Sequence, residues 1–281
     1  MKRLRIVHRT GFTYQGHVQT SYNEARMLPS TTDGQFVLEA GIQIDPPASQ
    51  NVYTDYFGSK VTAFEVLTKH SELSLTASSL VEVRPRPHHD SGITWEQLDQ
   101  LVRRSVETVE QSEQTHRTAP PEDLLELARE VRERHETPYG AALEIAETIG
   151  RAVEYVQGVT GVQTTAADAW SKKHGVCQDI THITLGALRS IGIPARYVSG
   201  YLHPRPDAPI GETVTGESHA WVEWFSGSWH GYDPTNLIEI GDRHVLVGRG
   251  RDYRDVAPLR GVYAGPFTSS LFVRVEITRE S

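Results

Sequence analysis

The chain has 281 residues, with 28 lysines and arginines against 36 aspartates and glutamates, and a formal net charge of −8. This length suggests about two domains, and the acidic balance gives no electrostatic support for nucleic-acid binding. Cys177 is the single cysteine, which excludes a disulfide framework within the chain and every zinc or iron–sulfur site built from several cysteines. Because we find neither a membrane-length apolar stretch nor a signal-peptide pattern, we expect a cytoplasmic protein that binds no membrane.

Residues 1–87 are predicted to form an antiparallel β-sandwich or barrel. Apolar residues alternate with polar ones in several segments of this part, as in half-buried strands. Turn sequences separate these segments, for example Thr32-Asp33-Gly34 and Phe57-Gly58-Ser59. The proline-rich residues 84–87 cannot continue a central strand, so we interpret them as a linker to a second domain over residues 88–281.

The second domain begins with helical spacing of its apolar residues. Thr94 and Gln97 predict a capping box at the start of a first helix. Further helices are predicted from residues 120–121, from Thr137 to near Gly158, over 165–170, and from Cys177 to Gly192. Strands are predicted over residues 195–202, 218–225, 228–233 and 271–278, with a surface loop over 203–216. This order indicates an α+β fold, in which the last strand could join either sheet.

Cys177 lies where a nucleophile is expected. It follows Gly175-Val176 and begins a helix, and the positive end of a helix dipole favours the thiolate over the thiol. Its backbone N–H, which has no partner within the first turn of the helix, could donate to an oxyanion. A single cysteine is nevertheless more often a small buried hydrophobic residue, so the thiol alone does not decide the function.

His219 and Asp233 complete a possible triad. His219 lies on one predicted strand and Asp233 ends the next, with Ser226-Gly227 as the hairpin turn between them. Antiparallel pairing can therefore bring the carboxylate beside the imidazole, as in thiol enzymes that use a nucleophile, a base and an orienting group. Taken singly, the histidine would more often be structural and the aspartate a turn residue.

Four linked motifs resemble the core of the bacterial transglutaminase-like superfamily over about residues 140–240. They are Gly175-Val176-Cys177-Gln178-Asp179, the segment 192–201, His219-Ala220-Trp221-Val222-Glu223, and Trp229 with Asp233-Pro234-Thr235. The segments 22–26 and 55–58 resemble the β-rich domain that often precedes this core. The resemblance implies a papain-like core in which Cys177 is the nucleophile, His219 the general base and then acid, and Asp233 the orienting carboxylate.

The same resemblance implies attack on a carboxamide or peptide carbonyl of a protein or peptide substrate, with a thioester intermediate. An amine acceptor would make the enzyme a transglutaminase, and water would make it a cysteine protease or a deamidase. A non-catalytic binding or scaffold protein is the competing class, against which the three intact residues argue. No cofactor is implied, and the oligomeric state is not predicted.

Other residues near these motifs are assigned mainly structural roles. Asp179 and His182 are expected to be a helix-start residue and a structural histidine, and His174 an exposed loop residue. For a second oxyanion donor, Trp170 and Gln163 are candidates between which the sequence does not choose. Trp221 could line the acyl groove or pack in the core.

No metal site is predicted. His88-His89-Asp90 is an adjacent cluster without a nearby third ligand. A site built from Cys177, His182 and His219 lacks metal-ligand spacing, such as two histidines one helical turn apart.

Overall fold

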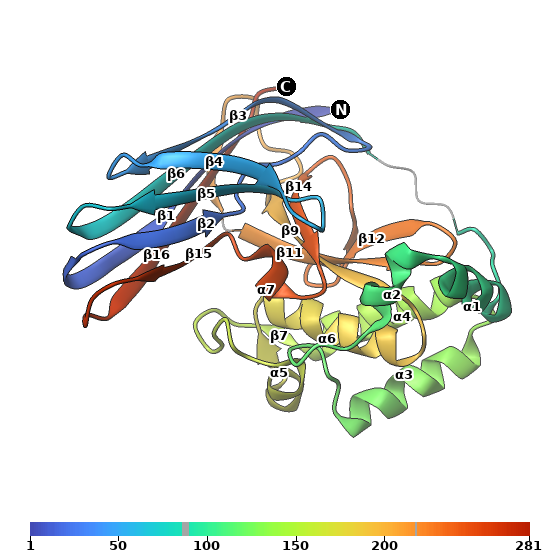
Figure 1. The fold of residues 1–281 in the computed structure, drawn as a ribbon. Helices are drawn as coiled ribbons and strands as arrows, with labels where there is room; N and C mark the ends of the chain where they lie inside the picture. Colours follow the sequence, from blue (N-terminus) through green and yellow to red (C-terminus); the bar gives the residue numbers. More distant parts are fainter. Residues whose placement is uncertain (86–89, 217) are drawn as a thin grey trace.

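The computed structural model describes residues 1–85, 90–216 and 218–281 and has the predicted α+β fold. Figure 1 shows long strands on one side, the helices on the other, and strands β9 and β11 between them. Residues 86–87 of the predicted linker and the His88-His89 pair lie outside the residues that the structure describes.

Two antiparallel sheets form the predicted N-terminal sandwich. The larger has the strand order β10–β16–β1–β6–β3, and the smaller has the order β15–β2–β5–β4. Apolar side chains that alternate in the sequence, among them Tyr14, Phe64 and Leu73, form a buried cluster in this sandwich. The strands are β1 (Lys2–Val18), β2 (Ser21–Ala25), β3 (Gln35–Asp45), β4 (Ser49–Thr54), β5 (Lys60–Val66), β6 (His70–Val83), β10 (Thr213–Gly216), β15 (Leu259–Tyr263) and β16 (Ser269–Arg279).

The end of the chain completes this sandwich. β15 pairs with β2 and β16 pairs with β1, so the last strand joins the N-terminal sheet. The two chain ends are hydrogen-bonded, with the Glu280 N–H donating to the Arg3 carbonyl at 2.8 Å. Strand β10, which pairs with β16, lies in the segment 203–216 that was predicted to be a loop. The loop prediction is therefore wrong for residues 213–216, because a strand this short carries little periodic signal.

A third sheet carries the helices. Its order is β13–β12–β11–β9–β14, with β9 (Ala195–Leu202), β11 (Ser218–Phe225), β12 (Trp229–Asp233), β13 (Ile238–Glu239) and β14 (His244–Gly250). The helices are α1 (Trp95–Arg104), α2 (Val106–Ser112), α3 (Glu122–Arg134), α4 (Pro138–Ala152), α5 (Ala166–Lys172), α6 (Cys177–Ser190) and α7 (Tyr253–Val256). Apolar residues of α3, α4, α5 and α6 share one buried cluster with β9, β11 and β12. Within the described part of the chain, each helix is too short or too polar to span a bilayer.

The start of α1 follows its local sequence signal, and the end of α4 does not. The capping box of α1 is present, since Thr94 Oγ1 accepts the Gln97 N–H at 3.3 Å and Gln97 Oε1 accepts the Thr94 N–H at 2.9 Å. Helix α4 ends at Ala152 rather than near Gly158. The chain leaves the helix there to form β7 (Glu154–Tyr155), which pairs in parallel with β8 (His174–Gly175).

The larger N-terminal sheet packs directly on the third sheet. Leu4 and Ile6 of β1 share a buried cluster with Tyr201 of β9 and Val245 of β14. Gln35 of β3 also clamps β14, because its side chain donates to the Leu246 carbonyl at 2.9 Å and accepts the Leu246 N–H at 2.8 Å. The two halves of the chain are therefore joined by buried apolar surface and by paired polar groups.

A substitution at Gly186 of α6 tests how closely this helix packs against its neighbours. A Cβ at this position would lie 2.1 Å from the Thr118 carbonyl oxygen. Replacing an interior helix glycine by alanine normally stabilises a helix by about 1 kcal/mol. Here we expect Gly186→Ala to lower the free energy of unfolding by about 1–3 kcal/mol in urea titrations, because overpacking dominates. Glu130→Ala, at an exposed position of α3, is the control, and a stabilised Gly186→Ala protein would contradict the packing argument.

Candidate active site

Cys177 is the first residue of α6 and is partly exposed, while residues 179–189 of the helix are buried. The turn before it requires glycine, since a Cβ on Gly175 would lie 2.8 Å from Asp179 Cβ. Asp179 Oδ2 accepts the Val176 N–H at 2.9 Å and the Thr160 hydroxyl at 2.6 Å. Asp179 therefore has the helix-start role that was expected, and it fixes the backbone that presents the thiol.

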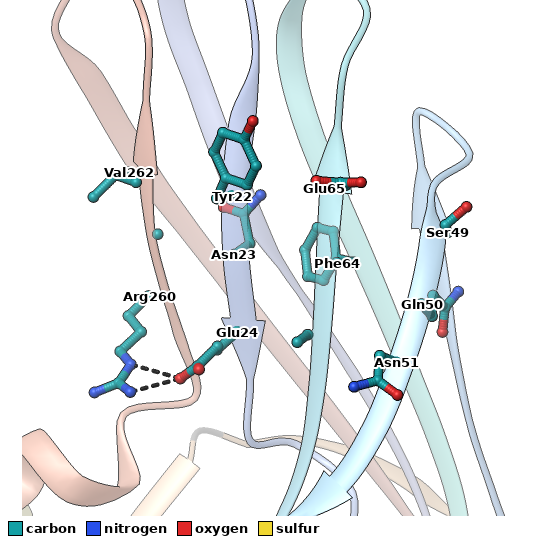
Figure 2. A pocket seen from close by; sticks show the side chains of 12 residues that line it. Tyr22, Asn23, Glu24, Ser49, Gln50, Asn51, Phe64, Glu65, Arg260 and Val262 are labelled. Carbon is teal, nitrogen blue, oxygen red and sulfur yellow. Dashed lines mark hydrogen bonds and ion pairs between the residues drawn. The ribbon is translucent and has the colours of Figure 1, made fainter.

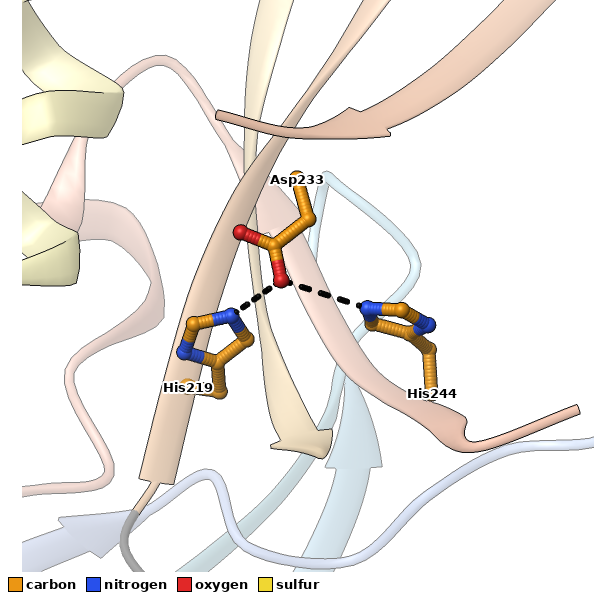
Figure 3. A group of neighbouring side chains, drawn as sticks. All are labelled: His219, Asp233 and His244. Carbon is orange, nitrogen blue, oxygen red and sulfur yellow. Dashed lines mark hydrogen bonds and ion pairs between the residues drawn. The ribbon is translucent and has the colours of Figure 1, made fainter. Parts of the chain in front are cut away.

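His219 and Asp233 lie side by side, as the hairpin prediction required. The β11–β12 ladder pairs Val222 with Tyr232, and Gly227 closes the turn with a φ of 91°. His219 Nε2 is 2.6 Å from Asp233 Oδ2. Figure 3 shows that the other ring nitrogen of His219 points away from this carboxylate. That nitrogen is therefore not engaged by the carboxylate.

Asp233 is completely buried, and each of its oxygens has partners. Oδ1 accepts the backbone N–H groups of Thr235 and Asn236 at 3.0 and 3.2 Å. Oδ2 accepts the Asn236 side-chain amide at 2.8 Å in addition to His219. Burial alone would raise the pKa of Asp233, but its hydrogen bonds to His219 and His244 and the positive charge of His219 hold that pKa well below its usual range. The carboxylate is therefore ionised.

The same contacts keep His219 protonated. Burial lowers the pKa of His219, but hydrogen bonds to Asp233 and to the Cys177 thiol, with the charges of both groups, outweigh burial and raise the pKa to about 10.

His244 is a site residue that sequence reasoning missed. It lies on β14, and its Nε2 is 3.4 Å from Asp233 Oδ2. Burial lowers the pKa of His244, which keeps the ring neutral, and its Nδ1 accepts the Gly241 N–H at 3.3 Å. The proton is therefore on Nε2 and faces the carboxylate. His244 lies eleven positions after Asp233 in the sequence (244 − 233 = 11), with strand β13 between them, so no local pattern could have indicated the contact.

The sequence-derived candidates for a second oxyanion donor have other partners. Trp170 Nε1 donates to Asp123 at 2.7 Å, and Gln163 Oε1 accepts from Arg117 at 2.7 Å. Trp221 is 1% exposed and packs against the His244 ring, so it belongs to the core rather than to a groove.

His182 has its predicted structural role, and His174 is exposed as predicted but lies in a strand. His182 is fully buried, and its Nε2 accepts the Tyr253 N–H at 3.1 Å, which confirms a structural role. His174 is exposed, and its Nε2 lies 3.3 Å from Glu154. His174 occupies the short strand β8 rather than the predicted loop, because β8 pairs with β7.

One trio in the described part of the chain has metal-ligand atoms close together. The donor atoms of His219, Asp233 and His244 lie within 4.8 Å of one another. Figure 3 shows both imidazoles directed at the same carboxylate oxygen. Both nitrogens that would bind an ion are already paired with this oxygen. In this structure the three groups are joined by hydrogen bonds through this one oxygen.

Of two hollows in the structure, one opens at this site and the other does not. One of about 530 Å³ opens at His219 and is also lined by Tyr155, Gln157 and Thr215. The other, of about 670 Å³, lies on the smaller N-terminal sheet, where Figure 2 shows Arg260 paired with Glu24. No residue of the Cys177, His219 and Asp233 group lines the second hollow. Only the first hollow is placed to hold a substrate of these residues.

The raised pKa of His219 predicts how stability depends on pH. Its pKa rises from 6.5 to about 10 in the folded chain, so the stabilisation is complete below pH 6.5 and is lost as the pH rises toward 10. We expect the difference in unfolding free energy between the wild type and His219→Gln to shrink over this range in urea titrations. A difference that stays constant or grows with pH would contradict the assigned contacts.

Comparisons with known proteins agree with this architecture. Residues 4–82 match the family model described as the bacterial transglutaminase-like N-terminal region, and residues 125–234 match that of the transglutaminase-like superfamily. The uncharacterized protein ML0607 of Mycobacterium leprae is 42% identical over 99% of both chains. The uncharacterized protein Mb2599c of Mycobacterium bovis is 31% identical over 98% of this chain and 92% of that protein.

A solved structure shares the whole fold. The crystal structure described as "a Putative Cysteine Protease from Cytophaga hutchinsonii" superposes with a TM-score of 0.77 at 21% identity. The match covers 100% of this chain and 92% of that one. The chain belongs to the transglutaminase-like superfamily and carries its bacterial N-terminal region.

Proposed function

We propose that this protein is a thiol-dependent acyl-transfer enzyme that acts on carboxamide or peptide bonds of protein or peptide substrates. The observation that carries the proposal is the His219–Asp233 pair at 2.6 Å, together with the Cys177 thiol, which is among the groups that raise the pKa of His219. Membership in the transglutaminase-like superfamily supports the same kind of chemistry. Cys177 is the nucleophile, His219 the acid and base, and Asp233 the orienting carboxylate.

In the first half-reaction the Cys177 thiolate attacks the carbonyl carbon. The C–S bond forms, and the carbonyl electrons move to oxygen to give a tetrahedral oxyanion. His219 then donates its proton to the departing nitrogen, the C–N bond breaks, and ammonia or an amine leaves. The products are a thioester on Cys177 and a neutral His219.

In the second half-reaction His219 acts as a base. It removes a proton from an incoming amine or water, which attacks the thioester carbonyl and displaces the Cys177 thiolate. An amine gives a new amide, as in a transglutaminase, and water gives a carboxylic acid, as in a protease or deamidase. The proposal therefore covers transfer and hydrolysis on one site, and the identity of the products separates them.

We assign the oxyanion to the Cys177 N–H and to the side-chain amide of Gln157. Strands β7 and β8 pair Tyr155 with Gly175, and the Val156 N–H donates to the Gly175 carbonyl at 2.9 Å. Gln157 lies two residues beyond Tyr155, as Cys177 lies two residues beyond Gly175. Gln157 also lines the hollow at His219.

The thiol assignment predicts rapid and selective alkylation. We expect iodoacetamide to label Cys177 faster than a model thiol near neutral pH, and His219→Ala to slow this labelling, because the imidazolium is removed. Labelling at the rate of a model thiol would count against the proposal.

The fate of the acyl group identifies the reaction. We expect casein incubated with and without a primary amine to show amine incorporation, deamidation or backbone cleavage by mass spectrometry. Cys177→Ala should abolish the change completely, since the chain has no other cysteine. Activity that survives in Cys177→Ala would rule out the thiol mechanism.

The Gln157 assignment predicts a loss in turnover. Gln157→Ala should lower kcat on the order of a hundredfold, as the loss of one oxyanion donor does. The alkylation rate of Cys177 should change little, because alkylation forms no oxyanion. Gln163→Ala is the matched control and should retain full turnover, because Gln163 is paired with Arg117. An equal loss in both variants would contradict the assignment.

A further inference from the structure

The hollow at His219 is bordered by the end of a sheet. Of its lining residues, Thr215 and Gly216 belong to β10, Ser218 and His219 begin β11, and Tyr155 lies on β7. β10 is the terminal strand of the larger N-terminal sheet, and its one partner among the described strands is β16. One backbone edge of β10 therefore has no strand beside it in the part of the chain that the structure describes.

The free edge of β10 faces the hollow. Neighbouring residues of a strand point their side chains to opposite faces, yet both Thr215 and Gly216 line this hollow. A Cβ on Gly216 would point at Ile277, whose Cδ1 would lie 3.8 Å away on the buried face. The hollow therefore meets Gly216 at its main chain. A backbone edge, with its N–H and C=O groups, borders the space next to His219.

The pairing of β10 with β16 on its other side fixes the position of this edge. Thr213 and Thr278 share a hydrogen bond of 2.7 Å between their hydroxyls, and the Gly211 N–H donates to the Arg279 carbonyl at 2.8 Å. Val214 packs against the buried cluster that contains Ile277. A preformed edge loses little conformational freedom when a ligand binds, which favours recognition through the main chain.

We propose that an extended segment of the acyl-donor polypeptide binds by adding a strand to the free edge of β10. This inference rests on the proposed function and names the form of its substrate. Main-chain hydrogen bonds to β10 would supply affinity over about 13 Å, the length of four residues in a strand. The donor residue would then lie beside His219 and Cys177. Such a substrate is an unfolded or looped segment, since a helix has no main-chain groups free to pair.

Hydrogen exchange on the intact but inactive Cys177→Ala protein tests this binding. The probe is casein with its lysines blocked by dimethylation, and backbone amides are compared with and without it. We expect exchange to slow by about tenfold at alternate amides of β10, because only every second N–H points to the free edge. The exposed edge strand β4 of the smaller sheet is the internal control and should be unaffected. No slowing in β10, or equal slowing in β4, overturns the inference.

The wild type, assayed on the same casein, separates the two proposals. Turnover without β10 protection retains the chemistry and refutes strand addition. Protection without turnover retains strand addition and refutes the chemistry. Neither result refutes both.

A side-chain change at the edge gives an independent measure. Thr215→Trp should fill the hollow and raise KM for casein by about tenfold. Val52→Trp, at an exposed position of β4, is the matched control. An unchanged KM in Thr215→Trp would contradict the proposed position of the substrate.

Discussion

The buried carboxylate of Asp233 is the constraint on which the site depends. A charge with no access to solvent is tolerated only when it is paired and hydrogen-bonded. Asp233 meets this condition through the backbone N–H groups of Thr235 and Asn236 and through two imidazoles. Because these partners fix both oxygens, the carboxylate can orient His219 and keep it protonated. The protonation state of His219 therefore depends on the turn that follows β12.

The N-terminal sandwich contributes to the same network from a distance. His244, the second imidazole on Asp233, begins β14, and β14 is clamped at Leu246 by the side chain of Gln35 from β3. The apolar cluster between β1 and β9 holds the two sheets together. A strand of the N-terminal half thus positions a histidine that supports the carboxylate. The sandwich is part of the structure that shapes the site rather than a separate appendage.

Local sequence signals predicted the elements that short-range interactions determine. The helix start at Cys177, the hairpin that joins His219 to Asp233, and the sandwich strands all follow from turn residues and short-range periodicity. The sequence did not indicate His244, because β14 brings it to Asp233 through pairing with β9 rather than through a local pattern. The helix end at Ala152 was also missed, since a parallel pairing with β8 overrides the apolar pattern that continues beyond it. The catalytic roles themselves stay predictions until the thiol is tested.

The path of the last strand explains why the site and the sandwich cannot be divided cleanly by residue number. β16 lies between β1 and β10, so the end of the chain joins its beginning to the segment that borders the hollow at His219. The β10–β16 pairings connect residues 59 to 65 positions apart (Gly216 with Val275, 275 − 216 = 59; Thr213 with Thr278, 278 − 213 = 65). Contacts this distant in sequence are formed only when most of the chain is already ordered. The wall beside His219 is therefore a product of the complete fold, and any change that loosens β16 should reach the substrate site through β10.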